Sequence, residues 1–376
     1  MSELGSFLAL LPADWRHGRF VGRVQTAAGP TPILVEAELA YDMSALAPTV
    51  SQLIEHLPVT GAQGTLLGPL DQLFAPWLSP VDLQVIKACG VTFATSTLER
   101  VIEEQARGDA TKAAEIRSRI EHRVGGSIGS VIPGSAEAQA LKELLIAEGL
   151  WSQYLEVAIG PYAEVFTKAP VLSTVGPLAE IGVRSDSTWN NPEPEVVLLA
   201  NAAGDVVGAC LGNDVNLRDI EGRSALLLGK AKDNNASCAL CPLVRLFDDG
   251  FTLDDVRTAE IDLLIEGPEG YRLEGHSSMR EISRDPLDLV AQTLNEHQYP
   301  DGFTLFLGTL FAPTQDRDDP GRGFTHKVGD VVTISTPRLG KLVNTVVTSA
   351  DAAPWTQGIS ALYANLAARG LLGAKA

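Results

Sequence analysis

Cysteine is scarce in this chain, with four residues among 376. Four thiols do not supply the disulfide framework that holds a small secreted domain together. Cys238 and Cys241 form one Cys-x-x-Cys pair, but a zinc site needs a second pair or nearby histidines. Redox chemistry is an alternative for this pair, and two buried thiols are the interpretation that the sequence favours.

Long hydrophobic runs and an excess of basic charge are also absent. No apolar stretch approaches the roughly 20 residues of a membrane-spanning helix, and the N-terminal residues lack the basic region and cleavage site of a signal peptide. The chain has 29 Lys and Arg against 47 Asp and Glu, for a formal net charge of −18. It lacks the basic footprint by which proteins bind nucleic acid or anionic membranes. We therefore expect a cytoplasmic, reduced protein without these two partners; a small anionic substrate remains compatible with a local cation site.

Length and composition indicate a soluble protein with two domains. A chain of 376 residues, 45% hydrophobic and 20% charged, can bury two cores. Residues 1–150 predict a smaller mixed α/β domain, and residues 151–376 predict a mostly antiparallel, sandwich- or barrel-like β domain. The predicted fold class is therefore α+β. In the second domain we expect strands at 155–159, 196–200, 206–211, 259–265, 304–311, 331–335 and 342–348.

Two helices have recognisable start signals. Asp285 precedes Pro286, which predicts an N-cap followed by proline at the first helical position. Ser96 and Glu99 have the spacing of a capping box, which predicts a helix that begins after Ser96.

Three carboxylates stand out between residues 189 and 235. Glu193 and Glu195 lie at the start of an apolar run, and side chains two apart in a strand point the same way. Asp214 follows in a turn-rich segment. Like charges that lie close together repel, so the site needs a compensating positive charge. A site rich in carboxylate oxygens suits a hard divalent cation such as Mg²⁺, whereas zinc prefers His or Cys ligands. An exposed acidic strand edge followed by a turn is the alternative explanation.

The second half of the chain resembles the fumarylacetoacetate hydrolase superfamily, because several short motifs occur in the order found there. These are Phe166-Thr167-Lys168, Pro192-Glu193-Pro194-Glu195, Gly212 to Asp219, Gly229-Lys230 with Asp233, Gly308-Thr309, and Gly340 to Asn344. The strings from Asn191 to Cys238, with Ser277-Ser278-Met279 and residues 282–286, are most similar to the 2-keto-3-deoxy-pentonate dehydratases of that superfamily. The long N-terminal segment is part of this similarity.

The resemblance implies a β-rich fold that binds Mg²⁺, or Mn²⁺ or Ca²⁺, through Glu193, Glu195 and Asp214. It implies a small-molecule 2-keto-3-deoxy sugar acid as substrate. It also implies a homodimer or homotetramer, since the family forms dimers through this domain.

Further residues are candidates for catalysis and substrate binding. Lys230 follows an apolar run and matches a lysine in the family's metal shell, so it is the first candidate base; pairing with a carboxylate ligand is its alternative role. Asp233 is the second candidate, unless it only forms a turn. Arg218 is expected to orient Asp214 or to bind the substrate carboxylate, with a surface salt bridge as the alternative. The candidates for substrate binding are Lys168, Arg218, Ser277, Ser278 and Thr309.

Two departures from the hydrolase members of the family favour an elimination. Glu221 stands where many members carry Gln. No histidine beside a carboxylate lies just upstream of Glu193, where the C–C bond hydrolases use one to activate water. His122 is the nearest upstream histidine and lies outside the matched region. The histidines of the second half, which could move protons or simply lie at the surface, are His276, His297 and His326.

The leading hypothesis is therefore a Mg²⁺-dependent dehydratase, a lyase of the hydro-lyase class. It would convert a 2-keto-3-deoxy-pentonate to 2-oxoglutarate semialdehyde in oxidative pentose breakdown. A bound cation would stabilise the enolate that forms when C3 loses a proton. The alternative is a metal-dependent hydrolase of the C–C bond of an acylpyruvate or diketo acid. A binding or regulatory protein without turnover is the third hypothesis.

Overall fold

The computed structural model describes residues 7–120, 129 and 131–373. Its strands form an eleven-stranded sheet, a five-stranded sheet and a two-stranded ribbon. The strands are β1 (Phe20–Thr26), β2 (Gly29–Glu36), β3 (Leu39–Asp42), β4 (Thr65–Pro69), β5 (Val85–Gly90), β6 (Glu164–Ala169), β7 (Glu180–Val183), β8 (Asn190–Asn191), β9 (Pro194–Ala200), β10 (Val206–Asp214), β11 (Asn216–Leu217), β12 (Cys238–Leu240), β13 (Leu243–Leu246), β14 (Glu260–Glu266), β15 (Arg272–Ser278), β16 (Phe303–Phe306), β17 (Val331–Thr336) and β18 (Gly340–Thr348).

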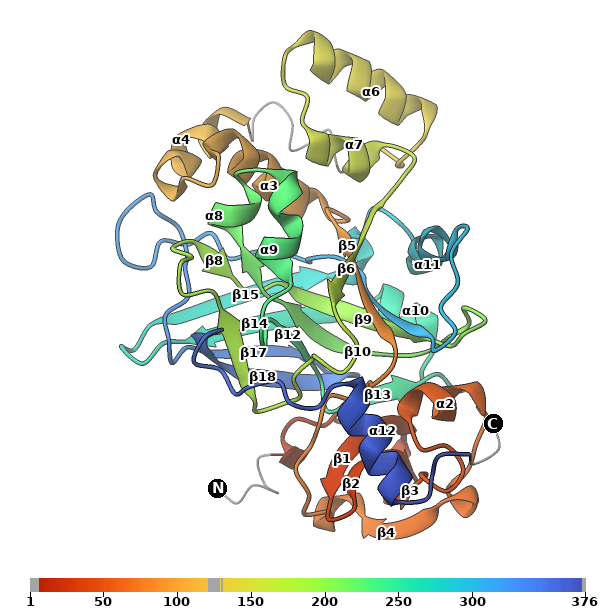
Figure 1. The fold of residues 1–376 in the computed structure, drawn as a ribbon. Coiled ribbons are helices and arrows are strands. Elements are labelled where there is room, and N and C mark those ends of the chain that lie inside the picture. The colour runs from red at the N-terminus through yellow and green to blue at the C-terminus, as the bar shows by residue number, and fades with distance from the viewer. Residues whose placement is uncertain (1–6, 121–128, 130, 374–376) are drawn as a thin grey trace.

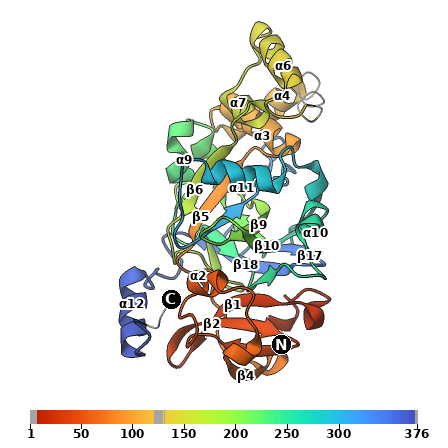
Figure 2. The ribbon, with the colours of Figure 1, turned by 90° about the vertical axis from the view of Figure 1, so that its right-hand side faces the viewer.

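Helices surround the sheets and gather mainly above one end of them (Figures 1 and 2). They are α2 (Val50–Glu55), α3 (Ala94–Ala106), α4 (Ala110–Ile120), α6 (Ala136–Ala147), α7 (Gln153–Ile159), α8 (Arg218–Glu221), α9 (Leu228–Lys232), α10 (Leu253–Arg257), α11 (Pro286–Leu294) and α12 (Ile359–Ala368). None of the helices within the described residues has the length and apolar character needed to cross a membrane.

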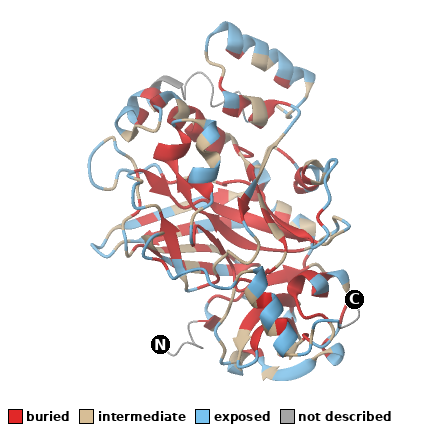
Figure 3. Ribbon diagram, viewed as in Figure 1, coloured by how far each residue is buried: buried red, intermediate tan, exposed pale blue. Residues whose placement is uncertain are grey.

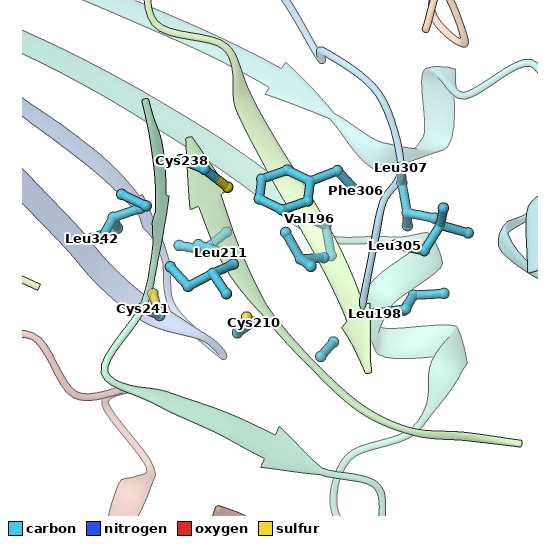
Figure 4. Packing of buried hydrophobic residues seen from close by; sticks show 14 of the residues in the cluster. Val196, Leu198, Cys210, Leu211, Cys238, Cys241, Leu305, Phe306, Leu307 and Leu342 are labelled. Carbon is cyan, nitrogen blue, oxygen red and sulfur yellow. The ribbon is translucent and has the colours of Figure 1, made fainter. Parts of the chain in front are cut away.

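The main core lies between the two large sheets. Strands β17 and β18 of the five-stranded sheet pack against β10 of the eleven-stranded sheet. All seven residues of β9 are buried (Figure 3), because β9 lies between β10 and β16 and both of its faces are covered. Figure 4 shows how the side chains of neighbouring strands meet there, including Val196, Leu211, Leu305 and Leu342. The predicted α+β class is confirmed.

Strand pairing crosses the predicted domain division at residue 150. The order in the large sheet is β4-β3-β2-β1-β13-β10-β9-β16-β5-β6, and the eleventh strand, β12, pairs with β10. Strands β1 to β4 form the lower lobe in Figure 1, where α12 packs beside them, and β13 joins this lobe to β10. Strand β5 also precedes residue 150, yet it pairs with β16 and β6 in the upper part. Residue 150 therefore does not divide the sheet.

Most of the strands predicted for the second half are confirmed, with small shifts at their ends. The exception at 155–159 is helix α7, whose N-cap Ser152 accepts a hydrogen bond from the N–H of Tyr154. A cap and a short buried helical face therefore override an apolar run that also fits a strand. The strand expected at 304–311 ends at Phe306, and the chain turns at Gly308, where φ is +105°.

The two predicted helix starts have different outcomes. Helix α11 begins as expected, because the side chain of Asp285 accepts a hydrogen bond from the N–H of Leu287 and Pro286 is the first residue. The capping box prediction is wrong. Helix α3 already begins at Ala94, and the hydroxyl of Ser96 donates to the carbonyl of Phe93 within its first turn.

Candidate metal centre

Glu193, Glu195 and Asp214 come together where β9 begins and β10 ends. Each offers a carboxylate oxygen within 4.8 Å of the oxygens offered by the other two, and all three side chains are buried. Glu193 directly precedes β9 and Glu195 is its second residue, so extended backbone places both side chains on one face. Antiparallel pairing sets Glu195 opposite Gly212 and Pro194 opposite Asn213. The exposed acidic edge that was the alternative explanation is therefore wrong for these residues.

Two cations compensate the charge of Glu193. Its carboxylate forms ion pairs with the guanidinium of Arg100 and the ammonium of Lys232. Burial alone would raise the pKa of Glu193, but Arg100 and Lys232 outweigh burial and lower the pKa to about 2. Glu193 is therefore a carboxylate at neutral pH.

Lys168 and Lys232 hold Asp214. The Nζ of Lys168 lies 2.7 Å from one Asp214 oxygen, and the Nζ of Lys232 lies 3.2 Å from the other. Lys168 is completely buried and also donates to the carbonyls of Val215 and Lys232. Its hydrogen bonds therefore go to these two carbonyls, and its contact with Asp214 is an ion pair.

Glu195 has a different environment, because it makes no ion pair with any described residue. One of its oxygens accepts a 2.7 Å hydrogen bond from the N–H of Gly308, and the other lies 3.4 Å from the hydroxyl of Thr309. Burial, followed by the carboxylates of Asp214 and Glu193, raises the pKa of Glu195 well above its usual range. Glu195 is thus the position at which this cluster lacks positive charge.

Gly308 brings its N–H to Glu195 because it has no side chain. Its φ of +105° is a conformation that other residues rarely adopt. A Cβ at this position would lie 1.9 Å from the hydroxyl oxygen of Thr92. The sharp turn after β16 therefore needs glycine.

A second layer of charges surrounds the three carboxylates. Arg100 also pairs with Glu103 at 2.5 Å and with Glu221 at 3.4 Å. Arg218 lies 3.3 Å from Glu103, and its Nε donates to the side-chain oxygen of Asn191 at 2.8 Å. Burial raises the pKa of Glu103 to about 7, although Arg100 and Arg218 lower it.

The structure separates the two residues that were the first candidates for proton transfer from the three carboxylates. Lys230 was expected to be partly buried beside a cation, but its side chain is 49% exposed and its Nζ lies 3.7 Å from Asp186. Asp233 is an exposed residue at the end of α9, as its turn alternative predicts. The helical turn of α9 instead points Lys232, two residues from Lys230, at the carboxylates.

Arg218 and Lys168 lie deeper than expected. Arg218 is only 1% exposed, so the surface salt bridge is wrong. It forms an ion pair with Glu103 and a hydrogen bond with Asn191 rather than contacts with Asp214. Lys168 was expected to bind the substrate, but it is completely buried beside Asp214, with which it forms an ion pair, and it donates hydrogen bonds to two carbonyls. The buried position of Lys168 and its ion pair with Asp214 favour a role in orienting this carboxylate.

Among the remaining substrate-binding candidates, Thr309 and Ser277 lie near the carboxylates and Ser278 does not. The hydroxyl of Ser277 lies 3.3 Å from the carbonyl of Leu310, next to Thr309. Ser278 follows Ser277 in β15 and therefore points to the opposite face. Its hydroxyl donates to Glu260 at 2.8 Å.

The histidines and cysteines of the second half take structural positions. His326 is buried between Asp330 and Asn190, and His276 lies at the surface beside Asp262. His122 lies outside the described residues. Cys238 and Cys241 are free and buried, which confirms the prediction of two buried thiols. Burial raises the pKa of Cys241 to about 12, so it is not a reactive thiolate at neutral pH.

Sequence reasoning missed Arg100 and assigned to Lys230 the position that Lys232 takes. Arg100 lies in α3, 93 residues before Glu193, and no motif marks it. Its spacing from Glu103 is that of an ordinary i,i+3 pair on an exposed helix. Lys232 could have been considered from the sequence, because it lies two residues after Lys230 in the same motif. The short helix α9 determines which of the two lysines faces the carboxylates.

The arrangement of sheets and buried carboxylates is the fumarylacetoacetate hydrolase-like fold. The apo form of 2-keto-3-deoxy-D-arabinonate dehydratase superposes with a TM-score of 0.61 at 19% identity, covering 88% of this chain and 99% of that chain. The fumarylacetoacetate hydrolase of the psychrophile Exiguobacterium antarcticum superposes with a TM-score of 0.58 at 16% identity, covering 88% of this chain and 99% of that chain. The predicted fold family is confirmed.

Two curated proteins are similar in sequence. A probable 2-keto-3-deoxyxylonate dehydratase of Haloferax volcanii is 32% identical over 195 residues, which are 52% of this chain and 64% of that protein. The 2-dehydro-3-deoxy-D-arabinonate dehydratase of Saccharolobus solfataricus is 28% identical over 183 residues, which are 49% of this chain and 58% of that protein. The match therefore spans less than two thirds of either relative. No protein-family model matches the chain. The predicted resemblance to the keto-deoxy-pentonate dehydratases is confirmed.

The donor set fits a hard divalent cation. Carboxylate oxygens that share one such ion at about 2.0–2.6 Å lie at most about 5 Å apart, and the three groups here offer oxygens within 4.8 Å of one another. The set contains no histidine or thiol, which zinc would prefer. The positive charge of an ion would also offset the repulsion that raises the pKa of Glu195.

Proposed function

We propose that this protein is a Mg²⁺-dependent dehydratase that converts a 2-keto-3-deoxy-pentonate to 2-oxoglutarate semialdehyde. The observation that supports this proposal is the buried set of Glu193, Glu195 and Asp214, in which Glu195 makes no ion pair within the described part of the chain. The similarity to two dehydratases of this substrate class points in the same direction. A solved structural neighbour, at a TM-score of 0.60 and 20% identity, is a complex of the arabinonate enzyme with magnesium and 2,5-dioxopentanoate.

In this proposal Glu193, Glu195 and Asp214 hold Mg²⁺, and Mn²⁺ or Ca²⁺ could replace it. A bound cation would supply a Lewis acid for the 2-oxo carboxylate of the substrate. Arg100, Lys168 and Lys232 would not touch the ion but would keep Glu193 and Asp214 ionised and oriented. Burial of the whole set keeps bulk water away from the reacting atoms.

Substrate contacts are proposed for residues beside Glu195. The hydroxyl of Thr309 already lies 3.4 Å from Glu195, and Ser277 lies beside the next residue of the same loop. Both hydroxyls could donate to a carboxylate or accept from a sugar hydroxyl. Arg218 would position this end of the site through Glu103 and Asn191.

The assay is incubation of the protein with Mg²⁺ and 2-keto-3-deoxy-pentonate of either stereochemical series, with detection of the semialdehyde by mass spectrometry of its hydrazone. We expect product that requires Mg²⁺ and disappears in EDTA. Pyruvate release from an acylpyruvate, without semialdehyde, would instead establish the hydrolase alternative. If Mg²⁺ stabilises the protein but neither product forms, the result would support the hypothesis of a binding or regulatory protein without turnover.

Glu195→Gln tests the metal role separately from activity. The variant keeps the volume of the side chain and the hydrogen bond from Gly308, so it should fold, but it loses one of three charged ligands. We expect it to lose turnover and most of the thermal stabilisation by Mg²⁺, since a ligand stabilises the fold only where it binds. Glu260→Gln is the matched control, because Glu260 is an exposed glutamate in β14. An active Glu195→Gln variant would show that the metal has been misplaced.

A cytoplasmic location and a homodimer or homotetramer complete the proposal. The four free, buried cysteines support a reducing compartment. Sedimentation of the purified protein would measure its oligomeric state.

A further inference from the structure

A cavity of about 420 Å³ lies where the turn between α3 and α4 meets the end of α8 and the loop between β16 and β17. Its volume is within the range of pockets that hold small molecules. Four arginines line it, namely Arg107, Arg223, Arg317 and Arg322. The chain as a whole has a net charge of −18, so the gathering of arginine is a local property of this cavity.

Only two of the four arginines are paired with carboxylates. Arg317 forms ion pairs with two of them, and the Nε of Arg322 lies 3.6 Å from Asp319. Arg107 and Arg223 are exposed residues, and neither guanidinium group has an ion pair or hydrogen bond with any residue that the structure describes. The cavity therefore holds two cations without partners.

The other carboxylates of the cavity wall are held by cations of their own. Asp318 lies 2.5 Å from the Nζ of Lys327, and Asp109 lies 3.2 Å from the Nζ of Lys112. One oxygen of Asp109 also accepts hydrogen bonds from the N–H and the hydroxyl of Thr111. These contacts leave the cavity wall without a free carboxylate that could compensate the two unpaired arginines.

The backbone of Arg107 gives a second reason to assign a role to its side chain. Arg107 ends α3 in the left-handed conformation, with φ of +53°, at a position where glycine or asparagine is usual. Side chains with a Cβ carry a conformational cost there. Residues held in such conformations are concentrated at ligand sites. The turn alone does not account for an arginine, whereas a contact made by its guanidinium group in the cavity does.

Trp189 is a buried part of the cavity wall. It is 3% exposed, and its indole N–H has no acceptor among the described residues. Buried donors in folded proteins are nearly always paired, so a ligand that carries acceptor oxygens suits this wall. The guanidinium of Arg218 lies 5.5 Å from the centre of the Trp189 ring. None of the three candidate metal ligands lines this cavity, so it is separate from the candidate metal centre.

We propose that this cavity binds a small molecule that carries a phosphate group, with Arg107 and Arg223 as its main contacts. A phosphate group carries about −1.5 to −2 charges near pH 7, which two guanidinium groups offset, whereas one carboxylate offsets only one of them. The planar fork of each guanidinium group also matches a pair of phosphate oxygens. Binding here requires neither Mg²⁺ nor the proposed dehydratase activity.

Titration calorimetry of the whole chain with inorganic phosphate and with pyrophosphate, in EDTA at low ionic strength, measures this binding. We expect one site per chain and an affinity lower by about tenfold or more in both Arg107→Asn and Arg223→Gln. Without phosphate, Arg107→Asn should be at least as resistant to heat as the wild type, because asparagine tolerates the left-handed conformation.

The matched control is Arg280→Asn, which removes the same charge from an exposed arginine that has no ion pair with a described residue and does not line this cavity. It should bind phosphate as the wild type does. So should Glu195→Gln, since Glu195 belongs to the candidate metal centre.

Four outcomes would overturn the proposal. They are no saturable binding of either anion by the wild type, equal affinity in the wild type and in both cavity variants, loss of binding in Glu195→Gln, and tighter binding of malonate than of phosphate. The third outcome would place the anion at the metal centre. The fourth would show that the cavity selects a dicarboxylate.

Discussion

At the scale of single residues, burial decides which charged side chains build the candidate metal centre. Lys168 and Lys230 are both lysines within recognisable motifs, yet one is completely buried and the other is half exposed. A buried charge is stable only with partners, and Lys168 has Asp214 and two carbonyls. The exposed pair of Lys230 with Asp186 is screened by water and contributes little.

Lys168→Met should destabilise the protein strongly, whereas Lys230→Met should not. Removing one partner of a buried ion pair costs about 3–5 kcal/mol, and a change at an exposed side chain usually stays within about 0.5 kcal/mol. The free energy of unfolding measured in urea, without added Mg²⁺, checks both values. Equal effects of the two substitutions would contradict the burial of Lys168.

At the scale of elements, the loop between β16 and β17 is held in place by a buried cluster around Asp330. Arg317 lies 2.6 Å from Asp330, and the ring of His326 lies 3.1 Å from it. The N–H of His326 in turn donates to Asn190 of β8. The cluster therefore fixes the loop against β8, and the second residue of that strand, Asn191, accepts a hydrogen bond from Arg218.

Asp330→Asn should lower stability in a pH-dependent way. Burial alone would raise the pKa of Asp330, but Arg317 and His326 outweigh it and lower the pKa to about 2. A carboxyl group with a lowered pKa stabilises the fold above its ordinary pKa of about 3.8, and this contribution is lost as the pH falls toward 2. In urea unfolding, the difference between wild type and variant should be full near pH 7 and 5 and smaller near pH 3.

The matched control for this variant is Asp319→Asn, since Asp319 is an exposed residue of the same loop with one ion pair at 3.6 Å. It should leave stability unchanged at each pH. A constant difference between wild type and Asp330→Asn across the pH range would show that the hydrogen bonds of Asp330, and not its charge, stabilise the loop.

At the scale of the whole molecule, the eleven-stranded sheet joins regions that the sequence divides at residue 150. Strand β13 connects β1 to β10, and β5 lies between β16 and β6. Helix α3, also from the first 150 residues, supplies Arg100 and Glu103 to the candidate metal centre. The candidate centre therefore depends on both parts of the chain.

A fragment of residues 151–376 should not fold or bind Mg²⁺. It lacks β5 and the Arg100 that pairs with Glu193, so it exposes two strand edges and leaves a buried carboxylate with fewer partners. Circular dichroism and Mg²⁺ titration measure these properties. The full chain should unfold in one calorimetric transition that Mg²⁺ shifts as a whole. Two transitions, of which only one responds to Mg²⁺, would instead support independent domains.

The sequence by itself predicted the features that depend on local geometry. The spacing of Glu193 and Glu195 predicts one strand face, because alternation is a property of the extended backbone. Asp285 and Pro286 predict the start of α11, because helix capping also depends only on residues that are neighbours in the sequence. The order of short motifs was sufficient to identify the fold family, as the superpositions confirm.

Only the tertiary structure decided which charges meet. Arg100, Lys168 and Lys232 lie on three different elements, and their positions follow from strand order and helix packing rather than from local spacing. Two residues of an α-helix differ by a rotation of about 200°, and this rotation within α9 separates the exposed Lys230 from the buried Lys232. Electrostatic compensation depends on distances of a few ångströms between residues far apart in sequence, and no local pattern contains those distances.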